Sequence, residues 1–147
     1  MNNLYINSIV LNKSLVDGPG VRTLVFFQGC DIRCPFCQNK STWDITKGNK
    51  ISVQELFDYL NDRSINKKVT LTGGEPLLQV EGLTELVHLL YDNGFNIALY
   101  TGHQKEEVPS DILEHINYLK YGPFIQNEKT TVKPYVGSKN QVFEKLR

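Results

Sequence analysis

The sequence has no excess charge of either sign and no long apolar run. Its 147 residues include 16 lysines and arginines and 16 aspartates and glutamates, so the formal net charge is zero. A balanced charge gives no reason to expect nucleic acid or an anionic membrane as a partner. The longest apolar stretches, such as 24–27 and 97–100, are far too short to span a bilayer. We therefore expect neither nucleic acid nor a membrane among its partners.

A secretion signal, an internal repeat and a low-complexity tract are also missing from the sequence. No charged segment followed by an apolar run opens the chain. We therefore expect a cytoplasmic protein. A chain of this length can form one domain that buries roughly two-thirds of its unfolded surface, so we expect a single domain over residues 1–147.

Cysteine is scarce, and its few copies are grouped. The chain has three cysteines, Cys30, Cys34 and Cys37, in one C-x-x-x-C-x-x-C run. An odd number cannot make a complete disulfide framework. Three thiolates on one short loop can hold three irons of a 4Fe–4S cluster and leave the fourth iron open to a small molecule. The run therefore predicts one such cluster with a catalytic role.

A structural zinc site is an alternative for three grouped thiolates. Structural zinc takes four protein ligands, so a histidine would have to complete the set. The three histidines, His88, His103 and His115, all lie far downstream and form no H-x-x-x-H pair. Iron is therefore better supported than zinc, and we assign no chemistry to His103.

Strand-like runs alternate with helix-like stripes along the chain. Ser52 and Glu55 form a capping-box pattern at the start of a helix that runs to about Asp62. A second helical stripe is stopped by Asn93 and Gly94. Strands are predicted over 22–28, 68–72, 95–100 and 118–120, and a short helix over 110–115. Strands that alternate with helices predict parallel pairing with right-handed crossovers.

The residues of chemical interest follow the predicted strands. The cysteine loop follows the first of them, Gly-Gly-Glu-Pro at 73–76 follows the second, and Tyr-Thr-Gly at 100–102 follows the third. Parallel sheets bind ligands at these carboxyl ends, and the chain is too short for eight β–α units. We therefore expect an α/β fold, an open, partial (β/α) barrel of mainly parallel strands with the Fe–S cluster loop at the C-terminal strand ends. Residues 121–147 lack clear periodicity, and a surface wrap is one interpretation of them.

Several motifs together resemble the radical S-adenosylmethionine enzymes. The three cysteines, with an aromatic residue before the last, and the downstream Gly-Gly-Glu-Pro carry this resemblance. Residues 16–22, 26–30, 37–39 and 42–44 are similar to the glycyl-radical activating enzymes. Residues 99–102, 121–124 and 137–141 are similar to the activase of the anaerobic (class III) ribonucleoside-triphosphate reductase. The resemblance runs from about Val16 to Gln141.

The resemblance implies two cofactors, one 4Fe–4S cluster and S-adenosylmethionine. It implies reductive cleavage of S-adenosylmethionine to methionine and a 5′-deoxyadenosyl radical, which takes hydrogen from a glycine of the partner. The implied partners are the large subunit of the anaerobic ribonucleoside-triphosphate reductase and a flavodoxin or ferredoxin-type reductant. Two alternatives stay open. One is an activase of another glycyl-radical enzyme, such as pyruvate formate-lyase, and the other is a non-catalytic iron–sulfur electron carrier.

The cysteine motif and the glycine-rich turn supply the first implied site residues. The three cysteines would ligate three irons and form the catalytic centre. Gly73 and Gly74 lack side chains, so their backbone can approach a bound methionine group closely. Glu75 or its neighbouring carbonyls can accept hydrogen bonds from the ammonium of that group. A plain strand-ending turn remains the alternative for the two glycines.

The other implied site residues lie in nearby loops. Phe36 would pack near the adenine, with core packing as its alternative. Asn39, Tyr100 and Thr101 belong to the family-like motifs, and we expect them to bind cofactor. Asp17 would suit a simple turn, but the resemblance implies a catalytic role on the substrate side. The formate-lyase activases carry Asp-Thr-Asn-Gly where this chain has Tyr100, Thr101 and a glycine, which argues against that assignment.

Overall fold

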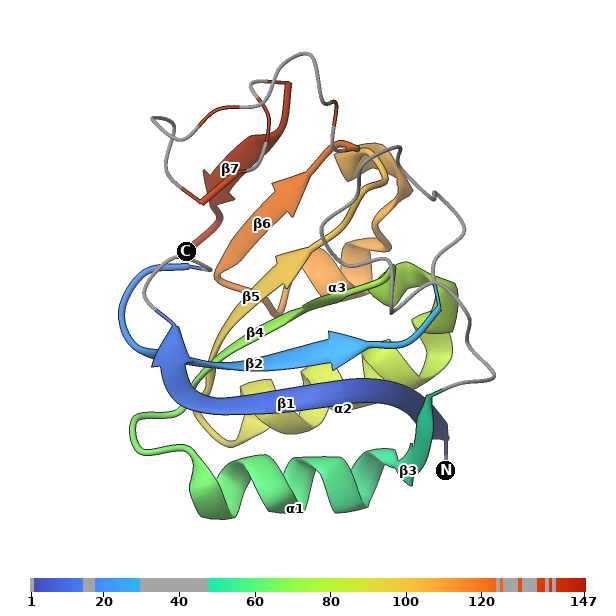
Figure 1. Ribbon diagram of the computed structural model, residues 1–147, viewed down its shortest axis with the longest axis vertical. Coiled ribbons are helices and arrows are strands. Elements are labelled where there is room, and N and C mark those ends of the chain that lie inside the picture. Colours follow the sequence, from blue (N-terminus) through green and yellow to red (C-terminus); the bar gives the residue numbers. More distant parts are fainter. Residues whose placement is uncertain are drawn as a thin grey trace.

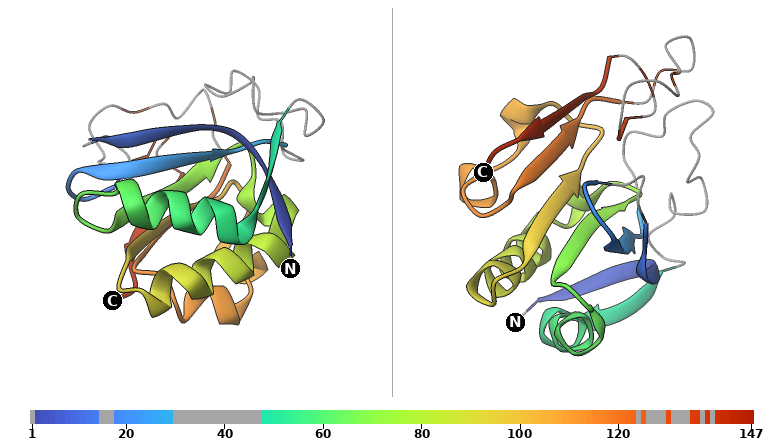
Figure 2. Two further views of the ribbon diagram at one scale, coloured as in Figure 1. Left: turned by 90° about the horizontal axis from the view of Figure 1, so that it is seen from below. Right: turned by 90° about the vertical axis from the view of Figure 1, so that its left-hand side faces the viewer.

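In the part of the chain that the structure describes, a mixed sheet carries all its α-helices on one face (Figures 1 and 2). The computed structural model describes residues 2–14, 18–29, 48–123, 125, 130, 135–136, 138 and 140–147. Its strands are β1 (Asn3–Ser14), β2 (Arg22–Phe27), β3 (Asn49–Ser52), β4 (Lys68–Gly73), β5 (Asn96–Tyr100), β6 (Tyr118–Tyr121) and β7 (Val142–Lys145). Its helices are α1 (Val53–Arg63), α2 (Val80–Asp92) and α3 (Ser110–Leu113), with short 3₁₀ helices at Pro76–Gln79 and Lys105–Glu107.

Parallel strands form the centre of the sheet. The strand order is β3-β1-β2-β4-β5-β6-β7, and β2, β4, β5 and β6 pair in parallel. The outer strands β1, β3 and β7 pair antiparallel to their neighbours. Because β3 and β7 end the order without pairing to each other, the sheet is open. The predicted open, partial barrel of mainly parallel strands is confirmed.

The helices begin and end where local signals place them. The capping box of α1 is present, because Ser52 Oγ accepts from Glu55 N at 3.1 Å and Glu55 Oε1 accepts from Ser52 N at 3.4 Å. Helix α2 ends at Asp92, and Gly94 just beyond it has φ +79° and donates its N–H to Tyr91 O at 3.1 Å. The third helix closes at Leu113, two residues earlier than its predicted end.

Alternate residues of the central strands face opposite sides of the sheet. One side packs against the helices and forms the hydrophobic core, with Val25, Leu71, Leu99 and Leu119 all fully or almost fully buried. Each buried leucine adds about 1.5–3 kcal/mol of transfer free energy. The opposite side carries buried polar and aromatic residues instead, among them Arg22, Thr70 and Tyr100. We call it the second face.

Three strands lie outside the sequence prediction. Strand β1 pairs with β2 from Ile6↔Phe27 to Ser14↔Arg22, and the short β3 pairs with β1. The C-terminal segment is more than a surface wrap, because β7 pairs with β6 from Tyr118↔Lys145 to Tyr121↔Val142. The interpretation of the tail as a wrap was wrong for these residues. The tail was misinterpreted because β7 has only four residues, none of them buried, and shows no apolar alternation.

Candidate functional site

The turn after β4 is bonded to the end of β2, directly before the cysteine loop. Gly74 N donates to Phe27 O at 3.0 Å, and Glu75 N donates to Gly29 O at 2.7 Å. Because β2 and β4 are parallel neighbours with Phe27 opposite Gly73, these bonds extend their pairing past the strand ends. The glycine-rich turn and the start of the cysteine segment are therefore held side by side at one sheet edge.

Gly73 is required by its contact with the neighbouring strand. Its φ is +115°, and a Cβ added there would lie 2.3 Å from Phe27 N and 2.6 Å from Phe27 O. Both atoms belong to backbone that the β2–β4 pairing fixes, so no side chain fits. This structural demand accounts for Gly73 without any ligand. Gly74 lies next to it, and its approach to the methionine group stays a prediction.

The Glu75 side chain bridges the loops that follow β4 and β5. It is fully buried, and its Oε2 accepts from Leu77 N at 3.0 Å and from Thr101 Oγ1 at 2.7 Å. Its Oε1 accepts from Gly102 N at 2.8 Å. Burial raises the pKa of Glu75 above 4.5, although these three hydrogen bonds act to lower it. A carboxylate can accept about four hydrogen bonds, so room remains for one further donor.

Thr101 and Tyr100 are neighbours in sequence, but their side chains lie in different surroundings. Thr101 lies beside Glu75, and its Oγ1 also accepts from His103 N at 3.1 Å. Tyr100 belongs to the second face, where it is 4% exposed and its ring lies edge-on to Phe143 at 6.3 Å. The Lys120 ammonium lies 4.3 Å from the centre of the Tyr100 ring. Of the two, the structure brings only Thr101 into contact with the Glu75 carboxylate.

An aromatic cluster on the second face was missed by sequence reasoning. The Phe143 ring stacks on Tyr118 at 5.5 Å and lies 4.7 Å from the ring of Tyr135. These rings join Tyr100 through Phe143. Phe143 reaches this cluster through the pairing of β7 with β6. Local sequence patterns do not predict that pairing, so the cluster could not be found from the sequence.

Arg22 is a second residue that sequence reasoning missed. Its side chain is fully buried, and its guanidinium donates to Thr70 Oγ1 at 2.9 Å, Pro19 O at 3.0 Å, Val69 O at 2.8 Å and Asn96 O at 2.9 Å. Burial lowers the pKa of Arg22 to about 10, so it stays charged at neutral pH. It ties the segment before β2 to the next two strands of the sheet, and Arg22 itself ends the family-like run 16–22.

Six predicted site residues lie outside the described residues: Asp17, Cys30, Cys34, Phe36, Cys37 and Asn39. Their chemistry rests on the sequence. What the structure adds is the anchoring of Gly29, the residue before the first cysteine, by Glu75 N. Three thiolates beginning at that point are a suitable donor set for three irons of a 4Fe–4S cluster. The donor set therefore fits one 4Fe–4S cluster.

Comparison with known proteins decides the family. The sequence model described as "4Fe-4S single cluster domain" matches residues 16–144. The anaerobic ribonucleoside-triphosphate reductase-activating protein of Escherichia coli K12 is 34% identical over 144 residues, which cover 90% of this chain and 94% of that protein. The chain belongs to this family of activating proteins. The resemblance found in the sequence and the single 4Fe–4S cluster expected from it are thus confirmed at the level of the family.

Other relatives match a smaller part of their own length. The pyruvate formate-lyase-activating enzyme of Clostridium pasteurianum is 41% identical over 110 residues, which cover 71% of this chain but only 46% of that enzyme. The chain therefore spans about half the length of that relative. Among solved structures, QueE from Escherichia coli superposes with a TM-score of 0.61 at 22% identity, over 81% of this chain and 70% of that chain. That likeness supports the fold alone.

No helix among the described residues is long and apolar enough to cross a membrane.

Proposed function

We propose that this protein is the activating enzyme of an anaerobic ribonucleoside-triphosphate reductase. In this proposal it reductively cleaves S-adenosylmethionine and generates a glycyl radical on the large subunit of the reductase. One structural observation supports the proposal most directly. The 2.7 Å bond from Glu75 N to Gly29 O sets the Gly-Gly-Glu turn beside the start of the cysteine loop. The relative of matching length bears the name of this activity.

Two cofactors supply the reaction in this proposal. Cys30, Cys34 and Cys37 would hold a 4Fe–4S cluster, which supplies the electron that cleaves S-adenosylmethionine bound at its open iron. The protein's own residues would orient the reacting groups and keep water away from them.

The described residues would position the substrate in three ways. Gly74 offers backbone at the strand end, where a methionine group can approach without a side chain in the way. Glu75 holds the β4 and β5 loops at a fixed separation through Thr101 and Gly102, and its Oε1 can take a further hydrogen bond from an ammonium. Tyr100 lines the second face beside Phe143. Phe36, Asn39 and Asp17 complete the proposed site, the first two near the cofactor and Asp17 toward the partner.

Pyruvate formate-lyase activation is the second candidate function. The identity of 41% to the Clostridium enzyme favours it, but that match covers less than half of the enzyme. The reductase-activating relatives match over nearly their whole length. We therefore place the reductase first. The reductant, a flavodoxin or ferredoxin, and the single domain over residues 1–147 are further parts of this proposal.

The test uses the two candidate partners side by side. Protein with an anaerobically reconstituted cluster is reduced, mixed with S-adenosylmethionine, and incubated with either the anaerobic reductase or the formate-lyase of the same organism. Electron paramagnetic resonance then detects a glycyl radical on the partner. We expect the radical on the reductase only, and none with a Cys34→Ala variant. A radical on the formate-lyase alone would overturn the assignment, and cleavage without a radical on either would point to another partner.

A further inference from the structure

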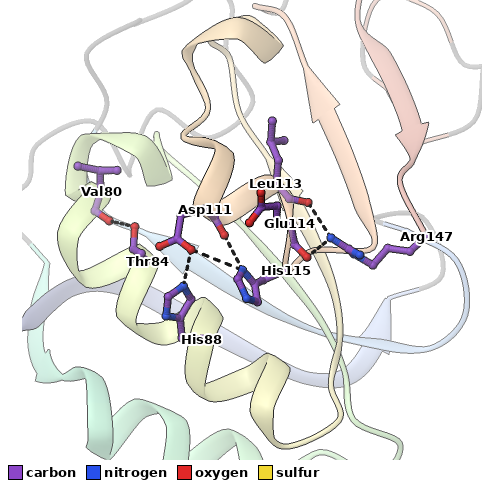
Figure 3. Close-up of polar contacts among 8 residues, drawn as sticks. All are labelled: Val80, Thr84, His88, Asp111, Leu113, Glu114, His115 and Arg147. Carbon is purple, nitrogen blue, oxygen red and sulfur yellow. Dashed lines mark hydrogen bonds and ion pairs between the residues drawn. The ribbon is translucent and has the colours of Figure 1, made fainter.

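Two histidines and an aspartate from distant parts of the sequence meet on the helical side of the sheet. His88 lies in α2, Asp111 in α3 and His115 just after α3 (Figure 3). One ligand atom from each, a ring nitrogen of either histidine and a carboxylate oxygen of Asp111, lie within 4.8 Å of one another. The centroids of the two imidazole rings are 4.6 Å apart. The cysteine loop emerges at the carboxyl ends of the strands, and none of these three residues takes part in the proposed site there.

The spacing of the three groups suits a metal ion. His88 Nε2 lies 3.0 Å from Asp111 Oδ1, and one ligand atom of His115 lies within 4.8 Å of a ligand atom of each of these two residues. Zinc binds imidazole nitrogen and carboxylate oxygen at about 2.0–2.2 Å in tetrahedral geometry, which puts neighbouring ligand atoms roughly 3.3 Å apart. The 3.0 Å separation between His88 Nε2 and Asp111 Oδ1 is close to that value. Small side-chain rotations would bring all three groups onto one ion.

The surroundings of His115 favour metal ligation further. Its Nδ1 lies 2.6 Å from the backbone oxygen of Asp111, so an Nδ1–H donated there leaves Nε2 with a free lone pair. Metal-ligating histidines commonly donate their other ring N–H to a backbone carbonyl in this way. The Tyr91 ring meets His115 edge-on at 4.7 Å and limits its rotation.

The backbone that presents these ligands is held from two sides. Helix α2 is anchored in the core by Leu86, Val87 and Leu90. The Arg147 guanidinium donates to Leu113 O at 3.3 Å and to Glu114 O (Figure 3). Its Nε also donates to Ile116 O at 3.0 Å. Arg147 thus fixes the chain between α3 and β6, on which His115 lies.

The ligand atoms are also accessible to an ion from solution. The side chains of His88, Asp111 and His115 are 43%, 52% and 25% exposed. Three protein ligands leave at least one position of a four-coordinate ion to water. Imidazole with one carboxylate suits the borderline divalent metals, of which zinc is the common case without redox chemistry.

We propose that His88, Asp111 and His115 form a zinc-binding site that joins α3 to α2. An ion there would tie the β5–β6 connection to the central helix. The ion would stabilise the protein because it binds the folded state in preference to the unfolded chain. Without metal the same groups form a hydrogen-bonded His–Asp–His cluster, and the experiment distinguishes the two states.

The test has to separate this site from the three thiolates, which also bind zinc. Zinc is therefore titrated anaerobically into protein with its 4Fe–4S cluster reconstituted, and the visible absorption of the cluster is followed throughout. The variants are His88→Gln, Asp111→Asn and His115→Gln. His103→Gln is the matched control, because His103 Nδ1 pairs with Glu107 Oε2 at 2.8 Å and His103 belongs to no group of three ligand side chains among the described residues. Far-ultraviolet circular dichroism checks that each variant is folded.

We expect one equivalent of zinc to bind with a micromolar dissociation constant and the cluster absorption to stay unchanged. Each of the three variants should bind at least about tenfold more weakly, whereas His103→Gln should match the unaltered protein. Zinc should raise the thermal unfolding midpoint of the unaltered protein and the control alone. Cobalt bound at this site should lack the intense thiolate-to-metal absorption. Absence of binding below millimolar zinc would overturn the proposal, and so would a zinc affinity in His88→Gln and His115→Gln equal to that of the unaltered protein.

Discussion

Thr101 Oγ1 donates a 2.7 Å hydrogen bond to the buried carboxylate of Glu75. This bond joins the loop after β4 to the loop after β5. Gly102 N reinforces it through the other carboxylate oxygen at 2.8 Å. Glu75 therefore organises the edge of the sheet at which cofactors are proposed to bind, in addition to any direct contact with a ligand.

Replacing Thr101 with valine should lower the free energy of unfolding by about 1.5–3 kcal/mol, the usual worth of a hydrogen bond to a charged group. The shape of the side chain is nearly kept, while the donor to Glu75 and the acceptor for His103 N are both lost. Thr84→Val is the matched control, because Thr84 Oγ1 only donates to Val80 O within α2 on an exposed surface (Figure 3). Urea unfolding measures both. Equal losses in the two variants would mean that the Thr101–Glu75 bond is energetically unimportant.

The raised pKa of Glu75 predicts a pH dependence of stability. Burial makes the folded protein hold this proton more tightly than the unfolded chain does. The contribution of Glu75 is therefore favourable below its ordinary value of 4.5 and is lost as pH rises through the raised value. The stability of the unaltered protein relative to Glu75→Gln should fall as pH rises above 4.5. Urea unfolding of both proteins across this pH range tests the sign. If the unaltered protein became more stable relative to Glu75→Gln as pH rises, the prediction would be contradicted.

Gly73→Ala should destabilise the protein strongly, because its Cβ would lie 2.3 Å from Phe27 N. Gly94→Ala is the control, since Gly94 also has positive φ but has nothing within 4 Å of an added Cβ. The control should lose about 1–2 kcal/mol from the left-handed conformation alone. We expect Gly73→Ala to lose clearly more in urea unfolding. Losses of the same size would show that backbone contact with β2 does not constrain Gly73.

Arg22→Lys should cost about 2–4 kcal/mol of unfolding free energy, because a lysine ammonium has three donors and lacks the planar fork that reaches four partners. The carbonyls of Pro19, Val69 and Asn96 are then partly unsatisfied. Arg63→Lys serves as the control, since Arg63 is 53% exposed. Thermal unfolding compares the two. A loss within about 0.5 kcal/mol for both would contradict the structural role of Arg22.

Much of this fold was predictable from local signals. The capping box at Ser52 and the stop at Gly94 placed α1 and α2, and buried apolar runs placed β4 and β5. The edge strands β3 and β7 were not predictable. They are only four residues long, carry no apolar alternation and exist through pairing with distant strands.

The candidate site was predictable in its position but less so in its contacts. Sequence order put Glu75 and Thr101 at neighbouring strand ends, and the structure confirms that they meet. It could not show that the Glu75 carboxylate already accepts three hydrogen bonds within the protein. Nor could it bring His88 and His115 together, because that contact depends on how α3 packs against α2. Contacts between elements are set by packing, which local patterns do not encode.

The most direct test of the central claim follows the reduced cluster as S-adenosylmethionine is added. If the three cysteine ligands and the glycine-rich turn surround one shared site, as proposed, the electron paramagnetic resonance signal of the reduced cluster should change on addition. 5′-Deoxyadenosine and methionine should then form in equal amounts. Alanine at Cys30, Cys34 or Cys37 should abolish both the signal and the products. A cluster signal that S-adenosylmethionine leaves unchanged, with no 5′-deoxyadenosine formed, would contradict the account and indicate an electron carrier.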